Sequence, residues 1–386
     1  MKPMEAIEHL AERIGPRGSC TPSEMEAVSW VEQQLVGLGL TAVSDSFRSA
    51  TSQYRPYLWF ALLALSGETL AWVGGKPGMI AAIVLLAIAT VSLFLELTFR
   101  PNLLRWMSPR GSSQNLWTRI PASGEEKRQV VLLAHIDTHR TPWLFDKRLV
   151  KLLDPIVPLA LLSCVVMLTM FSIHLASPGL LWLIITLPFA LIVLFVLVLM
   201  AQADMTPYTR GANDNASGVG VLLGVVGRLS RSPLANTTVW VVFTGCEEVG
   251  CYGAEAFARK HRSDLERPFW IAIDSAGGKG ANVTYIEKET FLATTRGDRQ
   301  LVELAARVAS ESPELEVTPH HFKGGYTEAV IGDKYGFRVM SVGSYRRDGV
   351  LPEWHRPTDV VGNLDPQVVE NAEAFVTRLM VGIDGL

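Results

Sequence analysis

Residues 238–248, TVWVVFTGCEE, contain the feature that decides both the fold and the chemistry of this chain. The apolar run from Val239 to Phe243 is typical of a strand buried on both faces, as in a parallel sheet. Such a strand has no structural use for the two adjacent carboxylates at its exit, Glu247 and Glu248. Because open α/β sheets bind ligands at the carboxyl ends of their strands, this pair indicates a functional site.

Working outward from this strand, the polar parts of the chain predict an α/β fold with a doubly wound, mostly parallel sheet. Further strands are expected at Val130–Ala134, Phe269–Ile273, Val283–Ile286 and Arg338–Val342. Helical spacing of apolar residues predicts helices at Pro3–Ile14, Pro22–Leu38, Ala216–Leu229, Asp298–Ser310 and Pro366–Met380.

Four long apolar stretches interrupt the polar chain and explain its positive mean hydropathy of +0.23. They cover Tyr57–Val73, Met79–Leu97, Ile156–Leu175 and Leu180–Met200. Each approaches the ~20 residues that a helix needs to cross a membrane, although Glu68 makes the first the least apolar. Turns at 74–78 and 176–179 pair them into two transmembrane hairpins. Core helices of a soluble protein are the weaker alternative, because residues 180–200 contain no charge.

These stretches divide the chain into a discontinuous catalytic domain (residues 1–53, 101–154 and 204–386) and two hairpins (residues 54–100 and 155–203). Two hairpins return the chain to one side of the membrane, so four spans place every polar segment on that side. By the positive-inside rule, the catalytic domain is expected in the cytoplasm, because the turns carry only Lys76. The basic residues near the membrane on the other side are Arg48, Arg55, Arg100, Arg105, Arg110, Lys147, Arg148, Lys151 and Arg210.

Charge and cysteine content exclude several classes of protein. The net charge is −3 and the basic residues form no stripe, which argues against a nucleic-acid partner. The first forty residues contain acids throughout and lack the apolar core of a signal peptide. Four cysteines are too few for a disulfide framework at this length, so we expect buried free thiols.

Five more polar residues accompany the Glu pair. His135 and Asp274 each directly follow a predicted strand, and Asp137 lies two residues after His135. Asp214 precedes a predicted helix, where a helix cap is the structural alternative. His355 lies in a loop without apolar periodicity. No single residue is decisive, but their shared placement at the ends of elements predicts one site.

Imidazoles and carboxylates together suit Zn²⁺, with Mn²⁺ or Co²⁺ as alternatives in the same environment. We predict two ions bridged by Asp214. His135 and Asp274 would complete one ligand set, and Glu248 and His355 the other, which leaves Glu247 as the general base. Asp137 would accept the imidazole N–H of His135 and orient that ring.

These motifs, in this order, resemble peptidase family M28, the di-zinc aminopeptidases. They are His135-x-Asp137, the GANDNASG run at 211–218, the Glu247-Glu248-x-Gly250 segment, Asp274-x-x-Gly277 and His355-x-x-x-Asp359. The resemblance implies the same ligands, the same base and the same orienting aspartate, and peptides as substrates. One departure is clear: residues 138–213, including a hairpin, separate two motifs that a short loop joins in the family.

Three other readings remain beside a membrane-anchored aminopeptidase. A glutaminyl-cyclase-like enzyme uses a similar fold and overlapping ligands with one zinc. An amide hydrolase of N-acyl amino acids would explain the membrane segments. A catalytically inactive membrane scaffold is disfavoured, because all seven positions are filled. The lipid bilayer is an expected partner, and a homodimer formed through the hairpins stays open.

Overall fold

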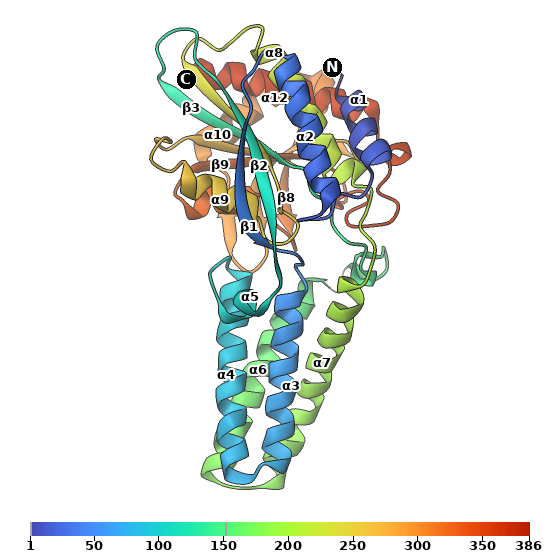
Figure 1. The fold of residues 1–386 in the computed structure, drawn as a ribbon, viewed down its shortest axis with the longest axis vertical. Helices are drawn as coiled ribbons and strands as arrows, with labels where there is room; N and C mark the ends of the chain where they lie inside the picture. The colour runs from blue at the N-terminus through green and yellow to red at the C-terminus, as the bar shows by residue number, and fades with distance from the viewer. Residues whose placement is uncertain (1, 151–152) are drawn as a thin grey trace. The chain divides into compact units, whose positions relative to one another are not determined.

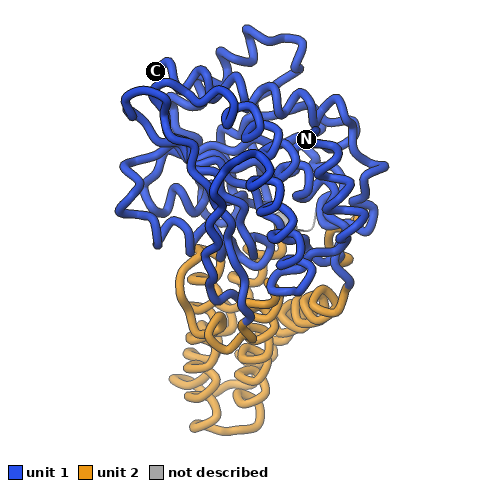
Figure 2. Tube along the Cα trace, turned by 45° about the horizontal axis from the view of Figure 1, so that its top comes forward, with its two compact units in different colours: residues 1–49, 111–141, 207–386 blue, residues 50–110, 142–206 orange. Residues whose placement is uncertain are grey.

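The computed structural model describes residues 2–150 and 153–386, so Lys151, one of the basic residues near the membrane, lies outside the described residues. The chain forms two compact units, coloured separately in Figure 2. Unit 1 contains residues 1–49, 111–141 and 207–386, and unit 2 contains residues 50–110 and 142–206. The domain boundaries expected from the sequence stay a prediction.

A nine-stranded mixed sheet forms the centre of unit 1, in the order β1-β2-β4-β3-β5-β9-β6-β7, with β8 paired to β6. Its middle strands run parallel: β4 (Thr237–Thr244), β3 (Arg128–His135), β5 (Phe269–Ile273) and β9 (Arg338–Tyr345). The strands β2 (Arg110–Ile120) and β6 (Asn282–Thr290) continue the sheet antiparallel on either side. The predicted parallel strands are therefore the middle of a larger mixed sheet.

Both faces of this sheet are covered, which explains the continuous apolar runs of its middle strands. All eight residues of β4 are buried. Val239, Val241 and Phe243 join the main hydrophobic core on one face. On the other face, Trp240 packs against Phe257 with ring centroids 6.2 Å apart. Because packing on both faces fixes β4, the position of its carboxyl end is also fixed.

Helices cover both faces of the sheet (Figure 1). The main core includes buried residues of α1 (Pro3–Glu8), α2 (Pro22–Gly37), α8 (Gly218–Leu229), α10 (Arg299–Glu311) and α12 (Pro366–Asp384). On the opposite face lie α9 (Tyr252–Lys260) and α11 (Ala329–Lys334). Side-chain caps define three helix starts: Thr21 caps α2, Asp298 caps α10 and Asp365 caps α12.

The sequence did not predict four outer strands: β1 (Val43–Ala50), β2, β7 (Thr294–Arg296) and β8 (Thr318–Lys323). Their polar composition hides them, since a strand that is partly exposed needs few apolar residues. In β1, for example, three of eight residues are buried. The predicted strands β3, β4, β5, β6 and β9 are all present.

Unit 2 contains four long helices and the short α5 (Leu103–Met107): α3 (Arg55–Val73), α4 (Gly75–Leu97), α6 (Leu153–Ala176) and α7 (Leu180–Asp204). Contacts join α3 with α4, α6 with α7, α3 with α7, and α4 with α6. Glu68 on α3 is buried and accepts 2.7 Å hydrogen bonds from Trp72 and from Thr186 on α7. This carboxylate therefore faces the inside of the bundle.

Within the described residues, three helices are long and apolar enough to cross a membrane: Gly75–Leu97, Pro155–Ala176 and Leu180–Asp204. The fourth expected span, α3, is a 19-residue helix. Arg55 and Glu68 lower its apolar character, so its membrane-spanning role stays a prediction. The first turn is also shorter than predicted, because α4 already begins at Gly75.

Candidate metal centre

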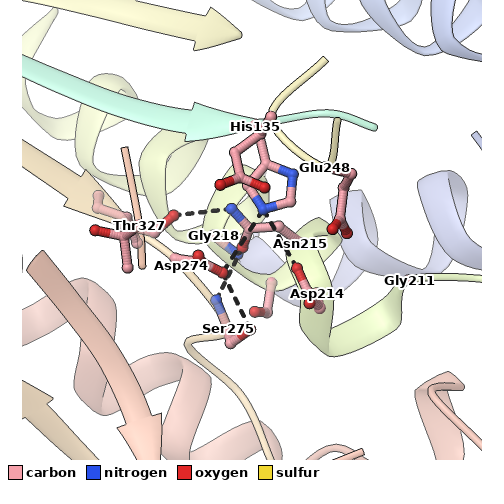
Figure 3. A network of polar contacts seen from close by, with 12 residues as sticks. His135, Gly211, Asp214, Asn215, Gly218, Glu248, Asp274, Ser275 and Thr327 are labelled. Carbon is pink, nitrogen blue, oxygen red and sulfur yellow. Dashed lines mark hydrogen bonds and ion pairs between the residues drawn. The ribbon is translucent and has the colours of Figure 1, made fainter. Parts of the chain in front are cut away.

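The seven candidate residues lie around the carboxyl ends of the parallel strands. Figure 3 shows four of them together: His135, Asp214, Glu248 and Asp274. His135 ends β3, the Glu247–Glu248 pair follows β4, and Asp274 follows β5. Because these strands are parallel neighbours, their ends meet at one edge of the sheet. Asp214 precedes α8, and His355 lies between β9 and α12. The structure thus brings together residues that are far apart in the sequence, and their roles stay predictions.

The carboxylate of Asp214 lies between the two histidines. Its Oδ1 atom is 3.3 Å from Nε2 of His135, and its Oδ2 atom is 3.3 Å from Nε2 of His355. Each histidine has a second carboxylate beside it. Asp274 Oδ1 lies 3.7 Å from His135 Nε2, and Glu248 Oε2 lies 3.2 Å from His355 Nε2. We call each histidine with its two neighbouring carboxylates a half-site, and Asp214 belongs to both half-sites.

Asp137 is fully buried and connects the β3 loop to the β4 loop. Its carboxylate accepts hydrogen bonds from Ser19 Oγ (2.6 Å) and from the backbone N–H groups of Glu247 (3.0 Å) and Glu248 (3.2 Å). Nδ1 of His135 lies 3.1 Å from the backbone carbonyl oxygen of Asp137 and 3.6 Å from its Oδ1. When Nδ1 donates its proton to this carbonyl, the lone pair of Nε2 of His135 is available to bind a metal ion.

Asn215 joins the Asp214 loop to the end of β5. Its amide nitrogen donates to the carbonyl of Ile273 at 2.9 Å, and its Oδ1 accepts from the N–H groups of Gly218 (2.9 Å) and Ser275 (3.1 Å). Figure 3 shows Asn215 between these two segments. This network sets the spacing between Asp214 and Asp274.

Asp359 supports the same loop from the other side. Its carboxylate accepts hydrogen bonds from the N–H groups of Asn213 (2.6 Å) and Asp214 (3.1 Å). Burial raises the pKa of Asp359 to about 7, although these two N–H groups oppose the shift. The sequence contained this residue only as the last position of a motif, and its contact with the Asp214 loop was not predicted.

Gly211 and Arg17 fix the backbone at the start of the Asp214 loop. Gly211 adopts a φ of +59°, and a Cβ there would lie 2.2 Å from Thr138 Cγ2, so only glycine fits. The buried guanidinium of Arg17 donates to the carbonyls of Ile136, Arg210 and Gly211, at 3.0, 2.8 and 3.0 Å. Burial lowers the pKa of Arg17 to about 10. Arg17 therefore holds the β3 loop and the Asp214 loop together.

The electrostatics of the site are those of a carboxylate cluster short of positive charge. Burial raises the pKa of Glu247 and of Glu248 well above the ordinary value, with nearby carboxylates adding to the shift. Burial lowers the pKa of His135, but Asp137, Asp214 and Asp274 raise it more, so it lies well above its usual value. Burial also opposes ionisation of Asp214, but His135 and His355 lower its pKa further than burial raises it.

Nε2 of His135 and Oε1 of Glu248 are buried and make no hydrogen bond within the described residues. A buried polar atom without a partner is costly, so it indicates a ligand that the protein itself does not supply. One donor atom each from His135, Asp214 and Glu248 lie within 4.8 Å of one another, as do those from His139, Glu248 and His355. These residues fit divalent metal ions.

Three residues beside or within the donor set adopt the left-handed backbone conformation: Cys246 (φ 55°), Ser275 (φ 56°) and His355 (φ 53°). This conformation is uncommon for residues other than glycine and is concentrated at functional sites. Each of the three redirects the chain beside a candidate ligand or base. The backbone geometry therefore agrees with the side-chain geometry about where the site lies.

None of the four cysteines, all within the described residues, forms a disulfide; three are buried and Cys20 is half-buried. Sγ of Cys251 lies 3.2 Å from Oε1 of Glu247, and Sγ of Cys20 lies 3.5 Å from Sγ of Cys246. Two further residues near the centre went unassigned from the sequence. Glu328 is buried, and burial raises its pKa to about 7. His139 stacks on His355, with ring centroids 3.4 Å apart.

Part of the chain matches a known protein family. Residues 194–380 match the profile of peptidase family M28. The chain carries a peptidase family M28 domain. This stretch contains Asp214, the Glu pair, Asp274 and His355, whereas His135 and Asp137 lie before it. The family assignment predicted from the sequence motifs is thereby confirmed, and it groups the protein with the metallopeptidases.

Two relatives share limited parts of the chain. It is 25% identical over 185 residues to aminopeptidase YwaD of Bacillus subtilis (strain 168), covering 46% of this chain and 38% of that protein. It is 30% identical over 88 residues to a vacuolar membrane protease of Candida tropicalis, covering 23% of this chain and 10% of that protein. The chain thus covers well under half the length of either relative.

Solved structures confirm the fold. A zinc aminopeptidase from Bacillus subtilis matches with a TM-score of 0.57 and 13% identity, covering 98% of this chain and 93% of that chain. The glutaminyl cyclase of Tannerella forsythia matches with a TM-score of 0.57 and 14% identity, covering 98% and 97%. The α/β fold of the zinc aminopeptidases is therefore established for this chain. The fold alone does not separate these two chemistries.

Proposed function

We propose that this protein is a membrane-anchored, metal-dependent aminopeptidase that removes N-terminal residues from peptides. One observation carries the proposal: the two carboxylate oxygens of Asp214 face Nε2 of His135 and Nε2 of His355, each at 3.3 Å. A carboxylate held between two imidazoles in this way is suited to bridge two divalent ions. The M28 domain supplies the peptidase context.

In this proposal, His135, Asp274 and Asp214 would hold one ion, and His355, Glu248 and Asp214 would hold the other. Nitrogen and oxygen donors of this kind suit Zn²⁺, and Mn²⁺ or Co²⁺ could occupy the same positions. When bound, the ions polarise the scissile carbonyl and lower the pKa of a bound water to about 7. His135 Nε2 and Glu248 Oε1, which make no hydrogen bond within the described residues, are the donors that such ions would satisfy.

Glu247 is the proposed general base. It is buried beside the half-sites but is not among the donors that converge on Asp214. Its carboxylate would take the proton of the attacking water and deliver it to the leaving amine. Burial, the largest cause, raises the pKa of Glu247 well above its ordinary value, which favours acceptance of a proton. The thiol of Cys251, 3.2 Å from Glu247 Oε1, helps to fix the position of the carboxylate.

Glutaminyl cyclisation is the second candidate, because a cyclase structure matches this fold as well as a zinc aminopeptidase does. A single-zinc enzyme needs one set of donors. The symmetric position of Asp214 between two histidines favours two ions and hence peptide hydrolysis. Hydrolysis of N-acyl amino acids and an inactive scaffold are the further alternatives that the experiment below separates.

We also propose that α3, α4, α6 and α7 cross the membrane as two hairpins, with the catalytic unit in the cytoplasm. Three of these helices have the required length and apolarity. Their turns carry only Lys76, and the basic residues concentrate at the other ends. Single cysteines introduced at Lys76 and at Ser177 should react with an impermeant maleimide from the outside of intact cells. Labelling only after permeabilisation would show that the turns lie in the cytoplasm and the catalytic unit outside.

The test of function compares three peptides that differ at the N-terminus, using full-length protein purified in detergent. We expect release of the first residue from a Leu-initiated peptide, no reaction with its N-acetylated form, and loss of activity with a chelator. Cyclisation of a Gln-initiated peptide without release of a residue would instead support the cyclase. Release of acetate from the blocked peptide would support N-acyl hydrolysis, and no reaction with any peptide would support the scaffold.

A further inference from the structure

His139 lies against the face of His355, although neither the sequence motifs nor the two half-sites use it. The two imidazole rings are stacked, with centroids 3.4 Å apart and planes inclined by 12°. His139 is buried, with 3% of its surface exposed. Nearly parallel rings at this separation are in van der Waals contact over their whole faces. His139 therefore covers one side of a proposed metal ligand.

The residues around His139 hold it in this position. They form a neck where the chain leaves unit 1 after Thr141 and returns at Pro207. In this neck, the N–H of Thr141 donates to the carbonyl of Pro207 at 3.0 Å, and the N–H of Thr209 donates to the carbonyl of His139 at 2.8 Å. The guanidinium of Arg140 lies over the ring of Tyr208, 4.4 Å from its centroid.

A hydrogen bond within the neck also fixes the rotation of the His139 ring. Nδ1 of His139 lies 2.7 Å from the carbonyl oxygen of Arg140, close enough to donate its proton there. Thr209 thus holds the backbone of His139, and the carbonyl of Arg140 holds the edge of its ring. A platform of this kind loses little conformational freedom when a neighbour binds a ligand.

The stacked geometry separates two roles for His139. Donor atoms of His139, Glu248 and His355 lie within 4.8 Å of one another, so distance alone would allow His139 to be a further ligand. A nitrogen lone pair lies in the plane of its ring, however. Because the two planes are nearly parallel and 3.4 Å apart, an ion in line with His355 Nε2 lies well outside the plane of His139. The contact is suited to support rather than to shared coordination.

We propose that His139 is a positioning residue, whose ring is a platform that holds the His355 imidazole in the orientation that binds the ion shared with Glu248. The proposal rests on the two-ion centre of the proposed function. It differs from the roles of Asp137 and Asp359, which act on the site through hydrogen bonds. His139 acts through the flat face of its ring.

Three substitutions test this role in the full-length protein. His139→Phe keeps a flat ring but has no nitrogen, His139→Leu keeps much of the volume but has no flat face, and His139→Ala removes both. Apoprotein of each variant is titrated with Co²⁺ and the two binding steps are followed by the visible absorption of the ion. Circular dichroism and the thermal midpoint report whether each variant is folded.

We expect the Leu and Ala variants to bind the first ion normally and the second about 10–100-fold more weakly, as for the loss of other residues that orient a ligand. The Phe variant should bind both ions with wild-type affinity. Two results would overturn the proposal: wild-type affinity in the Ala variant, or a Phe variant as weak as the Ala variant, which would make His139 a ligand through its nitrogen.

The wild-type titration tests the two-ion centre separately. If the wild-type chain binds one ion, the two-ion function fails. The role of His139 is then judged on that ion, which the Ala variant should still bind more weakly and the Phe variant normally. If all four proteins bind it equally, the platform is rejected as well.

Discussion

Asp137 accepts a 3.0 Å hydrogen bond from the backbone N–H of Glu247, so the residue beside His135 also holds the proposed base. Its other carboxylate oxygen accepts from Ser19 and from the N–H of Glu248. One buried side chain thus sets the distance between the end of β3 and the end of β4. This arrangement makes the metal ligands and the base depend on a common support.

Asp137→Asn tests that support. The amide keeps one acceptor oxygen, but its NH₂ group meets N–H or O–H donors where the carboxylate accepted them. We expect metal affinity to fall about 10–100-fold, together with the rate of hydrolysis. Ser19→Ala removes a single hydrogen bond of the same carboxylate and should have a much smaller effect. Metal affinity would be measured by competition with a chelator. Equal effects of the two substitutions on that affinity would contradict the role of Asp137 as a shared support.

Glu247→Gln tests the base. The amide is nearly the same size but cannot take a proton from water, so turnover should fall by roughly 10²–10⁴-fold while metal content is unchanged. The measurement is the initial rate of release of an N-terminal residue, alongside metal analysis of the same sample. Glu303→Gln, an exposed carboxylate on α10, is the matched control. A Glu247→Gln protein with a near-normal rate would remove Glu247 from this role.

Asp214→Asn tests the bridge. Both oxygens of Asp214 face a histidine, so replacing one oxygen with NH₂ weakens the half-sites together. We expect both ions to bind more weakly in a metal titration, with a large loss of activity. Asp264→Asn alters an exposed carboxylate beside His261 and serves as the control. Selective loss of one ion, with the other retained at normal affinity, would show that Asp214 belongs to a single half-site.

Metal binding should weaken on acidification. The pKa of His135 lies well above its usual value in the protein without metal, because Asp137, Asp214 and Asp274 together outweigh the effect of burial. A raised pKa means that a metal ion must compete with a more tightly held proton. Affinity should therefore rise from pH 6 to pH 8. Isothermal titration in buffers of different ionisation enthalpy counts the protons displaced, and a flat affinity would argue against ligation by His135.

The sequence predicted the fold correctly where a residue pattern has only one structural explanation. The buried strands β3, β4 and β5 appear as apolar runs, and polar residues at their exits, such as His135 and Glu248, have no packing role. The outer strands β1 and β2 were missed because their residues are largely polar or partly exposed. Apolar periodicity carries no signal for such strands.

Other parts of the site depend on contacts that no local pattern records. Asp359 reaches the Asp214 loop only because the loop after β9 folds back onto it. The stacking of His139 on His355 also depends on the neck between Thr141 and Pro207. The left-handed backbone of His355 likewise has no signature in its own residue type.

The central claim is a centre for two metal ions bridged by Asp214, and counting metal tests it most directly. Full-length protein purified in detergent would be analysed for metal per chain by mass spectrometry, before and after a chelator, with peptide hydrolysis measured on the same samples. The account predicts two zinc-class ions per chain, with hydrolysis lost on chelation and restored by Zn²⁺, Mn²⁺ or Co²⁺. One ion per fully active chain, or hydrolysis that persists without metal, would contradict it.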